Sequence, residues 1–212
     1  MAPTASIDAA PELLPPRARA DGTLRRLLET ALELFAARGY HGVSMRELAS
    51  AAGVGLSSVY GHVASKEDLL LELVLLAHDE HRDGLRLALL ETDGEPGQQL
   101  RAVVEAHVRL HATYPLLTIV ANNELHALPE GARRSVLAVR GDAERTITSI
   151  VERGQRQGVF SCDDAWLATA AIGGMGIRVA SWYRAGEGYS VDAVCRQYAL
   201  FALRLVGWTG LD

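Results

Sequence analysis

A helical spacing of apolar residues constrains the fold more than any other feature of this sequence, beginning at Gly22 and recurring almost to the end of the chain. The first such stretch follows the i, i+3, i+4, i+7 pattern of one face of an α-helix. Its apolar members are Leu24, Leu27, Leu28, Ala31, Leu32, Leu34 and Phe35. The apolar–polar alternation of strands joined by hairpin turns occurs nowhere in the sequence. The sequence therefore predicts an all-α protein with about nine helices.

Helix start and stop signals give the approximate boundaries. Gly39 ends the first helix, and Ser44 to Glu47 has the spacing of a capping box that begins the second. Ser65 to Asp68 resembles another such box and opens a long apolar-periodic run toward Leu90. Further helices are expected at about 57–63, 98–112, 115–127, 130–157, 163–184 and 190–207. The loop at 92–97 separates the long run from the helices that follow.

Composition places the chain among globular proteins. Hydrophobic residues make up 49% and charged residues 22% of the 212 positions, enough for a sizeable core. Four prolines in residues 1–20 predict a flexible N-terminal arm, followed by a domain at 21–66 and a larger one at 67–212. Only two cysteines occur, Cys162 and Cys195, and both are interpreted as reduced packing residues. Without a signal peptide or an apolar span of ~20 residues, a cytoplasmic protein with no membrane partner is expected.

The two short helices on either side of Gly53-Val54-Gly55 have the layout of a helix-turn-helix. In such a unit the second helix enters the DNA major groove with a short polar face. Four residues fit that face, namely Ser57, Ser58, Tyr60 and His62, while Val59 and Val63 are expected to point into the small core. Ser44 and Lys66 stand at helix N-termini, where anions such as phosphate bind. The alternative is an α-hairpin without DNA contacts.

These residues resemble a known family. The segment 43–71, VSMRELASAAGVGLSSVYGHVASKEDLLL, is similar to the DNA-binding domain of TetR-type transcriptional repressors, and the preceding LELFAARGYHGVS matches as well. The resemblance implies contacts to double-stranded operator DNA through Ser44, Arg46, Ser57, Ser58, Tyr60, His62 and Lys66. Gly55, Gly61, Val63 and Ala64 depart from the residues common in the family, which bears on operator recognition rather than on fold. Residues 17–66 carry seven basic and four acidic side chains, although the whole chain has a net charge of −5.

The family resemblance also implies a homodimer formed by the last two helices. The helix at 163–184 is rich in small residues that allow close helix approach, namely Ala168, Ala170, Ala171, Gly173, Gly174, Gly176 and Ala180. The last helix has an apolar face too wide to be exposed, formed by Val191, Val194, Cys195, Tyr198, Ala199, Phe201, Ala202, Leu205 and Val206. A four-helix interface between two copies would bury that face. The alternative is that the core of a single chain covers it.

The middle helices are expected to form a pocket for a small-molecule effector. The candidate ligand-binding residues are His107, His111, Asn123, Met175, Arg178 and Trp182. Arg178 interrupts an apolar helix, and a buried arginine needs an anion, either from a ligand or from an acidic side chain, unless it lies on a solvated helix edge. His107 and His111 have an i, i+4 spacing that suits a metal, with His78, His81 or Glu124 as a third ligand, but buried or pocket histidines are favoured, and neither a metal nor a cofactor is predicted.

The segment 111–129, HATYPLLTIVANNELHALP, resembles a branch of the family that includes regulators of lipid and sterol catabolism, some of which respond to acyl-CoA thioesters. The sequence thus predicts a ligand-responsive repressor released from DNA by a partly apolar, anionic molecule. An activator or a ligand-insensitive regulator of the same fold is the main alternative. An enzyme is not predicted, because no catalytic constellation is visible, and a helical adaptor would leave segment 43–71 without a role.

Overall fold

The computed structural model describes residues 12–18 and 22–210, and over these residues it holds nine α-helices, two short 3-10 helices and no strand. The prediction of an all-α fold with about nine helices is confirmed. The helices are α1 Gly22–Arg38, α2 Met45–Ala51, α3 Leu56–His62, α4 Lys66–Leu90, α5 Pro96–Thr113, α6 Pro115–Asn123, α7 Glu130–Arg156, α8 Ala165–Trp182 and α9 Val191–Leu205. The 3-10 helices are η1 Tyr40–Gly42 and η2 Leu125–Ala127.

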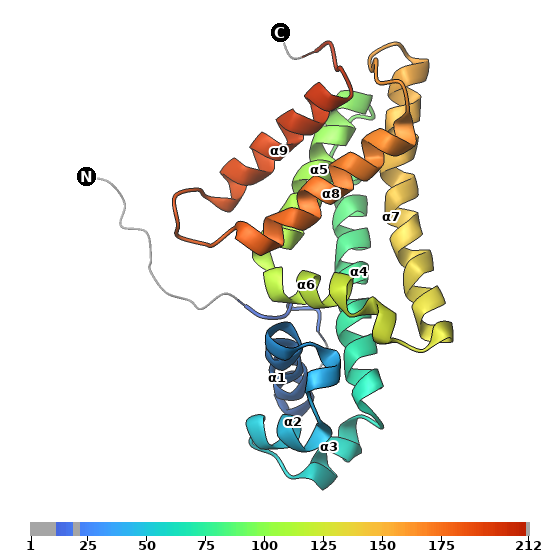
Figure 1. Cartoon of the computed structure of the whole chain (residues 1–212). Coiled ribbons are helices and arrows are strands. Elements are labelled where there is room, and N and C mark those ends of the chain that lie inside the picture. Colours follow the sequence, from blue (N-terminus) through green and yellow to red (C-terminus); the bar gives the residue numbers. More distant parts are fainter. Residues whose placement is uncertain (1–11, 19–21, 211–212) are drawn as a thin grey trace, which may run out of the picture.

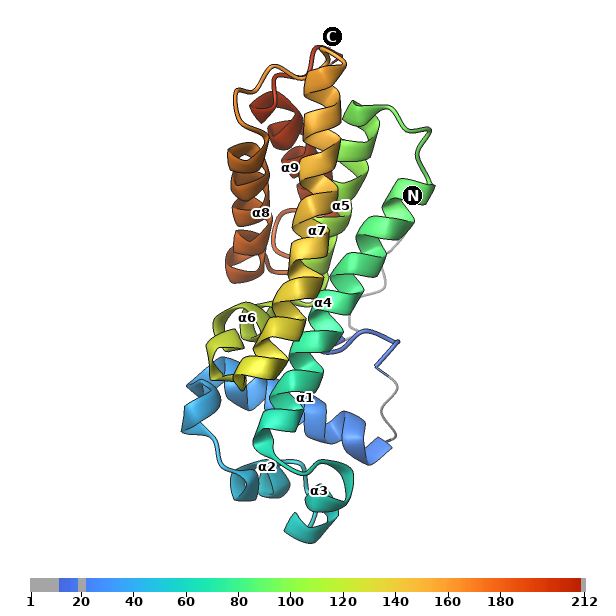
Figure 2. The ribbon, with the colours of Figure 1, turned by 90° about the vertical axis from the view of Figure 1, so that its right-hand side faces the viewer.

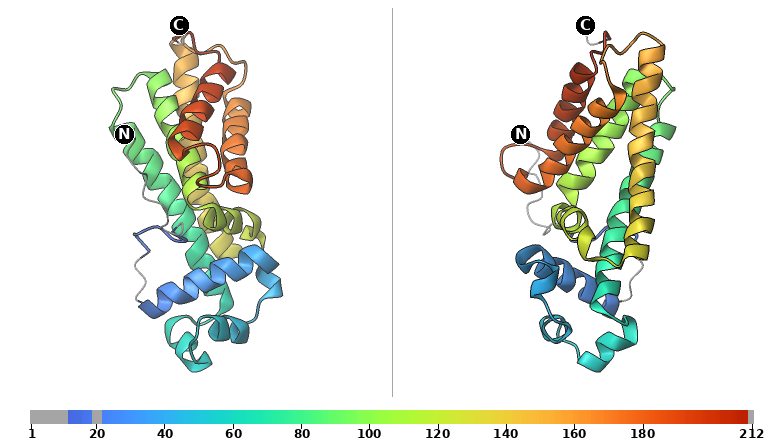
Figure 3. Two further views of the ribbon diagram at one scale, coloured as in Figure 1. Left: turned by 90° about the vertical axis from the view of Figure 1, so that its left-hand side faces the viewer. Right: turned by 45° about the vertical axis from the view of Figure 1, so that its right-hand side comes forward.

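The molecule is elongated, with a small head at one end of a helical body (Figure 1). Helices α1, α2 and α3 form the head, and α4 rises from it into the body. Seen from the side, α4 and α7 are the two long helices that run along the body, and α6 lies between the head and the other body helices (Figure 2). Helices α8 and α9 lie together on one flank of the body, where both contact α5 (Figure 3). The body therefore has one flank made entirely from the last two helices.

Two apolar cores stabilise this arrangement. The first contains the buried residues of the head, such as Leu32 and Val59, and extends through Leu73 of α4 to Leu117 of α6. The second fills the body between α5, α7, α8 and α9 and receives Leu85 from the far half of α4. Each leucine taken out of water in these cores contributes roughly 1.5–3 kcal/mol before the entropic costs of folding. Because α4 belongs to both cores, it is the mechanical link between head and body.

Residues 12–18 correct the prediction of a flexible arm. Leu14 is fully buried in the first core, and its carbonyl accepts a hydrogen bond of 3.2 Å from Arg25 of α1. Arg17 pairs with Glu80 at 3.3 Å and with Asp83 at 2.8 Å, both on α4. The prolines prevent a helix here, but they do not prevent an extended segment from packing its leucine against the body. The rest of the predicted arm, 1–11 and 19–20, lies outside the described residues.

The capping signals account for most helix boundaries. Ser44 caps α2 through a reciprocal pair, in which the Ser44 hydroxyl accepts from the Glu47 N–H at 3.3 Å and the Glu47 carboxylate accepts from the Ser44 N–H at 2.8 Å. Ser65 also caps α4, but Asp68 reaches the N–H of Ala64 instead of completing a box. The helix expected at 115–127 ends earlier, at Asn123, and is followed by η2. Over the described part of the chain, no helix has the length and apolar character needed to cross a membrane.

Candidate functional site

The head presents one short helix with a polar outer face. The turn between α2 and α3 closes with Gly53 at φ 67°, a left-handed conformation that glycine adopts without strain. Within α3, Val59 is completely buried, and Val63 just beyond the helix packs against the same core. On the opposite face the four residues predicted for groove contact, Ser57, Ser58, Tyr60 and His62, are all exposed. The inward and outward faces of α3 are therefore the ones the spacing predicts.

Gly61 lies on the exposed part of α3, and a Cβ atom added there would meet no other atom within 4 Å. Packing within the chain therefore does not require glycine at this position. Its effect is instead to leave the outer face of α3 without a side chain beside Tyr60. The departure from the residues common in the family thus concerns the surface of the recognition helix alone.

Lys66 has a different environment from the one expected for a phosphate contact. Its ammonium donates hydrogen bonds to the carbonyls of Tyr40 at 2.9 Å and Val43 at 2.7 Å, and it lies 4.1 Å from the centroid of the Tyr40 ring. These contacts direct the charge into the protein, joining the start of α4 to the segment that precedes α2. In this structure Lys66 therefore holds the start of α4 against the segment before α2, and its expected contact with phosphate stays a prediction.

Ser44 is also engaged inside the head. Its hydroxyl donates to the Glu47 carboxylate at 2.8 Å, and Arg38 pairs with the same carboxylate at 3.1 Å. Hydrogen bonds from the Ser44 hydroxyl and N–H, together with Arg38, lower the pKa of Glu47 to about 2, so the cap stays ionised. Arg46, one residue into α2, is exposed. Ser44 and Lys66, the two residues expected on phosphates, are thus engaged within the head, whereas the DNA-contact candidate Arg46 is exposed to solvent.

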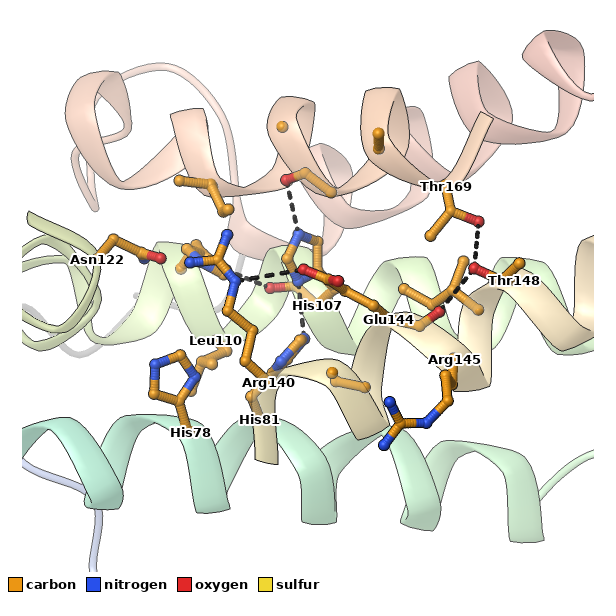
Figure 4. Close-up of a pocket in the computed structure, with 18 of the residues that line it drawn as sticks. His78, His81, His107, Leu110, Asn122, Arg140, Glu144, Arg145, Thr148 and Thr169 are labelled. Carbon is orange, nitrogen blue, oxygen red and sulfur yellow. Dashed lines mark hydrogen bonds and ion pairs between the residues drawn. The ribbon is translucent and has the colours of Figure 1, made fainter. Parts of the chain in front are cut away.

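The body encloses a cavity of about 670 Å³ between α4, α5, α6, α7 and α8 (Figure 4). Its apolar walls include Leu110, Ala121, Ile147 and Ile177. Its polar residues gather in two places. Four histidines from α4 and α5, His78, His81, His107 and His111, line one side, and a charged group on α7, Arg140, Glu144, Arg145 and Glu152, lines another. This size and mixture of linings suit a small organic ligand.

The histidines form a connected cluster at the centre of the cavity wall. Nδ1 of His107 lies 2.8 Å from Nε2 of His81, and Nε2 of His107 lies 3.1 Å from the carbonyl oxygen of Gly173 on α8, so His107 lies between α4 and α8 (Figure 4). The ring of His111 stands 4.6 Å from that of His107, and its Nδ1 is 2.8 Å from the His107 carbonyl oxygen. The cluster thereby ties three helices together around the cavity.

Burial governs the protonation of these histidines. Desolvation, followed by the nearby Arg140 guanidinium, lowers the pKa of His78 to about 4. Desolvation together with His107 lowers the pKa of His111 to about 3, and burial lowers the pKa values of His81 and His107 too. All four rings are therefore neutral near pH 7. In the part of the chain that the structure describes, no group of three or more such side chains is arranged to hold a metal ion.

On the α7 side the polar groups are paired with one another. The Arg140 guanidinium pairs with Glu144 at 3.3 Å, and Arg145 pairs with Asp142. The Thr148 hydroxyl donates to the carbonyl of Glu144 at 2.9 Å and lies 3.1 Å from the Thr169 hydroxyl on α8. The polar side chains named here on this wall therefore already have hydrogen-bond or ion-pair partners within the protein.

The structure separates the predicted ligand-binding residues. His107 and His111 line the main cavity. Asn123 and Arg178 line a second cavity of about 250 Å³, which shares its walls at Thr118, Asn122, Gly174 and Ile177 with the first. Arg178 is exposed rather than buried, because its place on α8 is at a solvated edge of the helix. Of the alternatives left open for Arg178, the structure shows the solvated helix edge, at the rim of the second cavity.

Met175 and Trp182 are in neither cavity. Met175 packs against the body core, and Trp182 is exposed and stacks on Tyr198 of α9 at a centroid distance of 6.4 Å. Glu124, considered as a metal ligand, lies beside Gly39 of the head. Sequence reasoning missed Arg140, Thr148 and Thr169 of the cavity because nothing local marks them as facing inward. His78 and His81 were noticed only as possible metal ligands, although their i, i+3 spacing on an apolar helix was a signal for the cavity.

The flank formed by α8 and α9 carries a set of large exposed apolar side chains. They are Trp166, Leu167, Trp182, Tyr189, Phe201 and Leu205. Part of the predicted interface is covered within the chain, because Val194, Cys195 and Ala199 are buried in the body core. Coverage by the core of a single chain therefore holds for one face of α9, and the other face is exposed on the flank.

The short helix α3, with its polar outer face after the turn at Gly53, has the layout of the second helix of a DNA-binding helix-turn-helix. Family models agree with this interpretation. Residues 27–73 match the model described as bacterial regulatory proteins of the tetR family, and residues 93–206 match a tetracyclin repressor-like C-terminal domain. The chain belongs to the TetR family of bacterial transcriptional regulators. It is a regulator and not an enzyme.

Relatives resemble the chain along most of its length. The HTH-type transcriptional repressor KstR2 of Rhodococcus jostii is 27% identical over 188 residues, which is 86% of this chain and 90% of KstR2. The structure of the regulator PfmR from Thermus thermophilus has a TM-score of 0.76 and 32% identity, covering 88% of this chain and 99% of PfmR. A crystal structure of AibR in complex with isovaleryl coenzyme A and operator DNA has a TM-score of 0.75 at 22% identity, covering 88% and 99%, and shows likeness of fold.

Proposed function

We propose that the chain is a homodimeric, ligand-responsive transcriptional repressor that acts in the cytoplasm and binds palindromic operator DNA. The observation that carries this proposal is that one helix, α4, is built both into the core of the DNA-binding head and into the wall of the ligand cavity. Residues 21–66 then form the DNA-binding unit, and 67–212 form the ligand-binding and dimerisation unit. The relative KstR2 resembles the chain along most of its length and is a repressor, which supports repression rather than activation.

On DNA, α3 lies in the major groove with its exposed face on the base edges. That face is formed by Ser57, Ser58, Tyr60 and His62. The exposed Arg46 contacts phosphate, whereas Ser44 and Lys66 hold α2 and α4 in position. With Gly61 in the middle of the face, the backbone of α3 has room to approach the bases closely, which is how we account for the absence of a larger side chain there.

The dimer is formed through the open flank of α8 and α9. Six large apolar side chains are exposed on these two helices and the loop between them, and an exposed apolar patch of this kind marks an interaction site. Pairing two copies about a two-fold axis forms a four-helix interface and sets the spacing between the two recognition helices. Two heads on one operator double the number of phosphate contacts.

The effector occupies the main cavity with its apolar part and reaches the adjoining small cavity with an anionic part. The two cavities share four wall residues, so one elongated ligand can fill both. Arg178 lies at the small cavity and is exposed, which suits the phosphate or carboxylate end of an acyl-CoA thioester. The complex of the similarly folded AibR with isovaleryl coenzyme A supports this ligand class.

Release follows from a difference in ligand affinity between two states of the dimer. Helix α4 contributes Ala77, His78 and His81 to the cavity, and its first turn is tied to the head by Lys66. A ligand that prefers a shifted α4 changes the spacing of the heads and weakens DNA binding. A hundredfold preference corresponds to about 2.7 kcal/mol of coupling, which a few cavity contacts can supply.

The test is fluorescence anisotropy of the purified protein on the DNA upstream of its own gene, with and without a panel of acyl-CoA thioesters. We expect specific binding that one or more thioesters release. Arg178→Ala should weaken release while leaving DNA affinity unchanged, and Arg134→Ala, at an exposed position of α7, is the matched control. Binding that no thioester releases would refute the ligand class and leave a DNA-binding regulator. Affinity no higher than for random DNA would argue against a nearby operator.

A further inference from the structure

The hydrogen bonds of His107 fix which of its nitrogens carries the proton. A backbone carbonyl can only accept, so the contact between His107 Nε2 and the Gly173 oxygen requires an N–H at Nε2. In a neutral ring the other nitrogen, Nδ1, is then an acceptor. The His107 ring also packs closely on α8, because a methyl group added at Gly176 would overlap it.

The tautomers of the two neighbouring histidines follow from that of His107. Nδ1 of His107 accepts, so His81 must donate from Nε2, and its Nδ1 is left as an acceptor. His111 donates from Nδ1 to the carbonyl of His107, which leaves its Nε2 as an acceptor. Both side chains line the main cavity. Neutral tautomers are the ones present near pH 7, because burial lowers the pKa values of both rings.

The polar groups that line the cavity near this cluster do not supply donors to these nitrogens. The hydroxyl of Thr118 donates to backbone carbonyls of its own helix turn, and that of Thr169 donates to the carbonyl of Ala165. The Asn122 amide donates to the carbonyl of Thr118 at 2.7 Å, and the Arg140 guanidinium pairs with Glu144.

We propose that the histidine side of the main cavity selects an effector that carries a hydroxyl or another neutral hydrogen-bond donor, and discriminates against one with a carbonyl or carboxylate there. This inference rests on the proposed function, in which the cavity is the effector site. A donor meets acceptor nitrogens whose orientation is already fixed. A carbonyl oxygen would face the same nitrogens with lone pair against lone pair, and its loss of hydration would go uncompensated.

Two measurements test the proposal, and the first needs no ligand. Protein labelled with nitrogen-15 in its histidines is examined at pH 7 by long-range proton–nitrogen correlation spectra, which distinguish the two neutral tautomers and the imidazolium form. We expect protons on Nε2 of His81 and His107 and on Nδ1 of His111. A proton on Nδ1 of His81, or an imidazolium at any of the three, would overturn the proposal.

The second measurement compares 2-decanol with 2-decanone, which carry at the same carbon either a hydroxyl that can donate a hydrogen bond or a carbonyl that can only accept one. Calorimetric titration should show that the alcohol binds about tenfold more tightly, the expected cost of mispairing one buried polar group. The preference should shrink in His111→Phe, which keeps a ring but removes the acceptor, and persist in His41→Asn on the exposed surface of the head. Equal binding, preference for the ketone, or no binding of the alcohol would overturn the proposal.

These probes contain no coenzyme A, and the titration contains no DNA. Failure of the alcohol preference is therefore separable from failure of the proposed function, which is judged by release of operator DNA with acyl-CoA thioesters. Release by a thioester without any alcohol preference would leave the repressor and reject the donor selection. An alcohol preference without release would keep the donor selection and reject the acyl-CoA effector.

Discussion

The head and the cavity of this molecule are built on opposite principles. In the head, the residues proposed to meet DNA all lie between Arg46 and His62, within 17 consecutive positions, and their orientation follows from one turn and two short helices. The cavity takes residues from Ala77 to Ile177, on five helices. Local spacing is enough to determine the first surface, whereas the second exists only when distant helices pack. The two parts should therefore respond differently to the same kinds of change.

Acidification should produce the largest change in folding stability, and the cavity histidines should cause it. His78 and His111 have pKa values of about 4 and about 3 in the folded protein, below the value of 6.5 for a free histidine. Below pH 6.5 the unfolded chain therefore binds protons at these residues that the folded chain does not bind. Their contribution to stability is present above pH 6.5 and is lost as the pH falls toward 4. By pH 5 the loss should be about 2 kcal/mol for each histidine.

Urea unfolding at pH 7 and at pH 5 measures this loss. His111→Phe should remove part of the pH dependence, and His41→Asn is the control. A stability of the wild type that does not change between the two pH values would show that the cavity histidines are not held neutral by the fold.

Lys66→Met should give the next largest effect, and it contrasts with Arg46→Ala in the same head. Lys66 loses two hydrogen bonds from a charged group and a contact with the Tyr40 ring, so stability should fall by about 2–3 kcal/mol. Arg46→Ala should leave stability unchanged but flatten the salt dependence of DNA binding by about one unit of slope. Urea unfolding and anisotropy titrations over a salt series distinguish them. If Lys66→Met kept full stability but showed a flatter salt dependence of DNA binding, Lys66 would be a phosphate contact.

Gly176→Ala should disturb the cavity without touching the head. A methyl group at this position would overlap the ring of His107 and push it from its contact with α8. We expect a loss of about 1–3 kcal/mol in stability from overpacking, and weaker effector binding with unchanged DNA affinity. Gly173→Ala on the same helix has open space for its methyl group and serves as the matched variant for stability, although not for effector binding because Gly173 lines the cavity. Equal effects of the two substitutions would mean that the loss comes from α8 itself.

Tyr60→Ala should change DNA binding and little else. The side chain is 53% exposed, so its removal should alter stability by less than about 0.5 kcal/mol. Operator affinity should fall about tenfold or more, with a smaller loss on random DNA, because a base-edge contact is worth about 1–3 kcal/mol. Gly61→Ala next to it tests whether close backbone approach matters, since helix propensity alone favours alanine. An unchanged operator affinity for both would remove this face of α3 from the groove.

The comparison of head and cavity also shows which features could be predicted from the sequence and which could not. The cap at Ser44, the turn at Gly53 and the buried face at Val59 were all predicted from sequence, because each depends on neighbours within a few residues. The hydrogen bonds of Lys66 were not predicted, because the carbonyls that hold it lie 23 and 26 residues earlier in the chain. For Arg178 the sequence left a buried ion pair and a solvated helix edge open, and only the packing of α8 decided for the edge.

The sequence by itself determined the helical class, the helix-turn-helix and the faces of α3, since helix periodicity and capping are short-range properties of the chain. Only the tertiary structure decided that Leu14 is part of the core, that four histidines from two helices share one cavity, and that Gly173 of a third helix sets the tautomer of His107. The physical reason is that burial, desolvation and hydrogen-bond pairing depend on which surfaces meet, and those surfaces lie up to 100 residues apart in the chain.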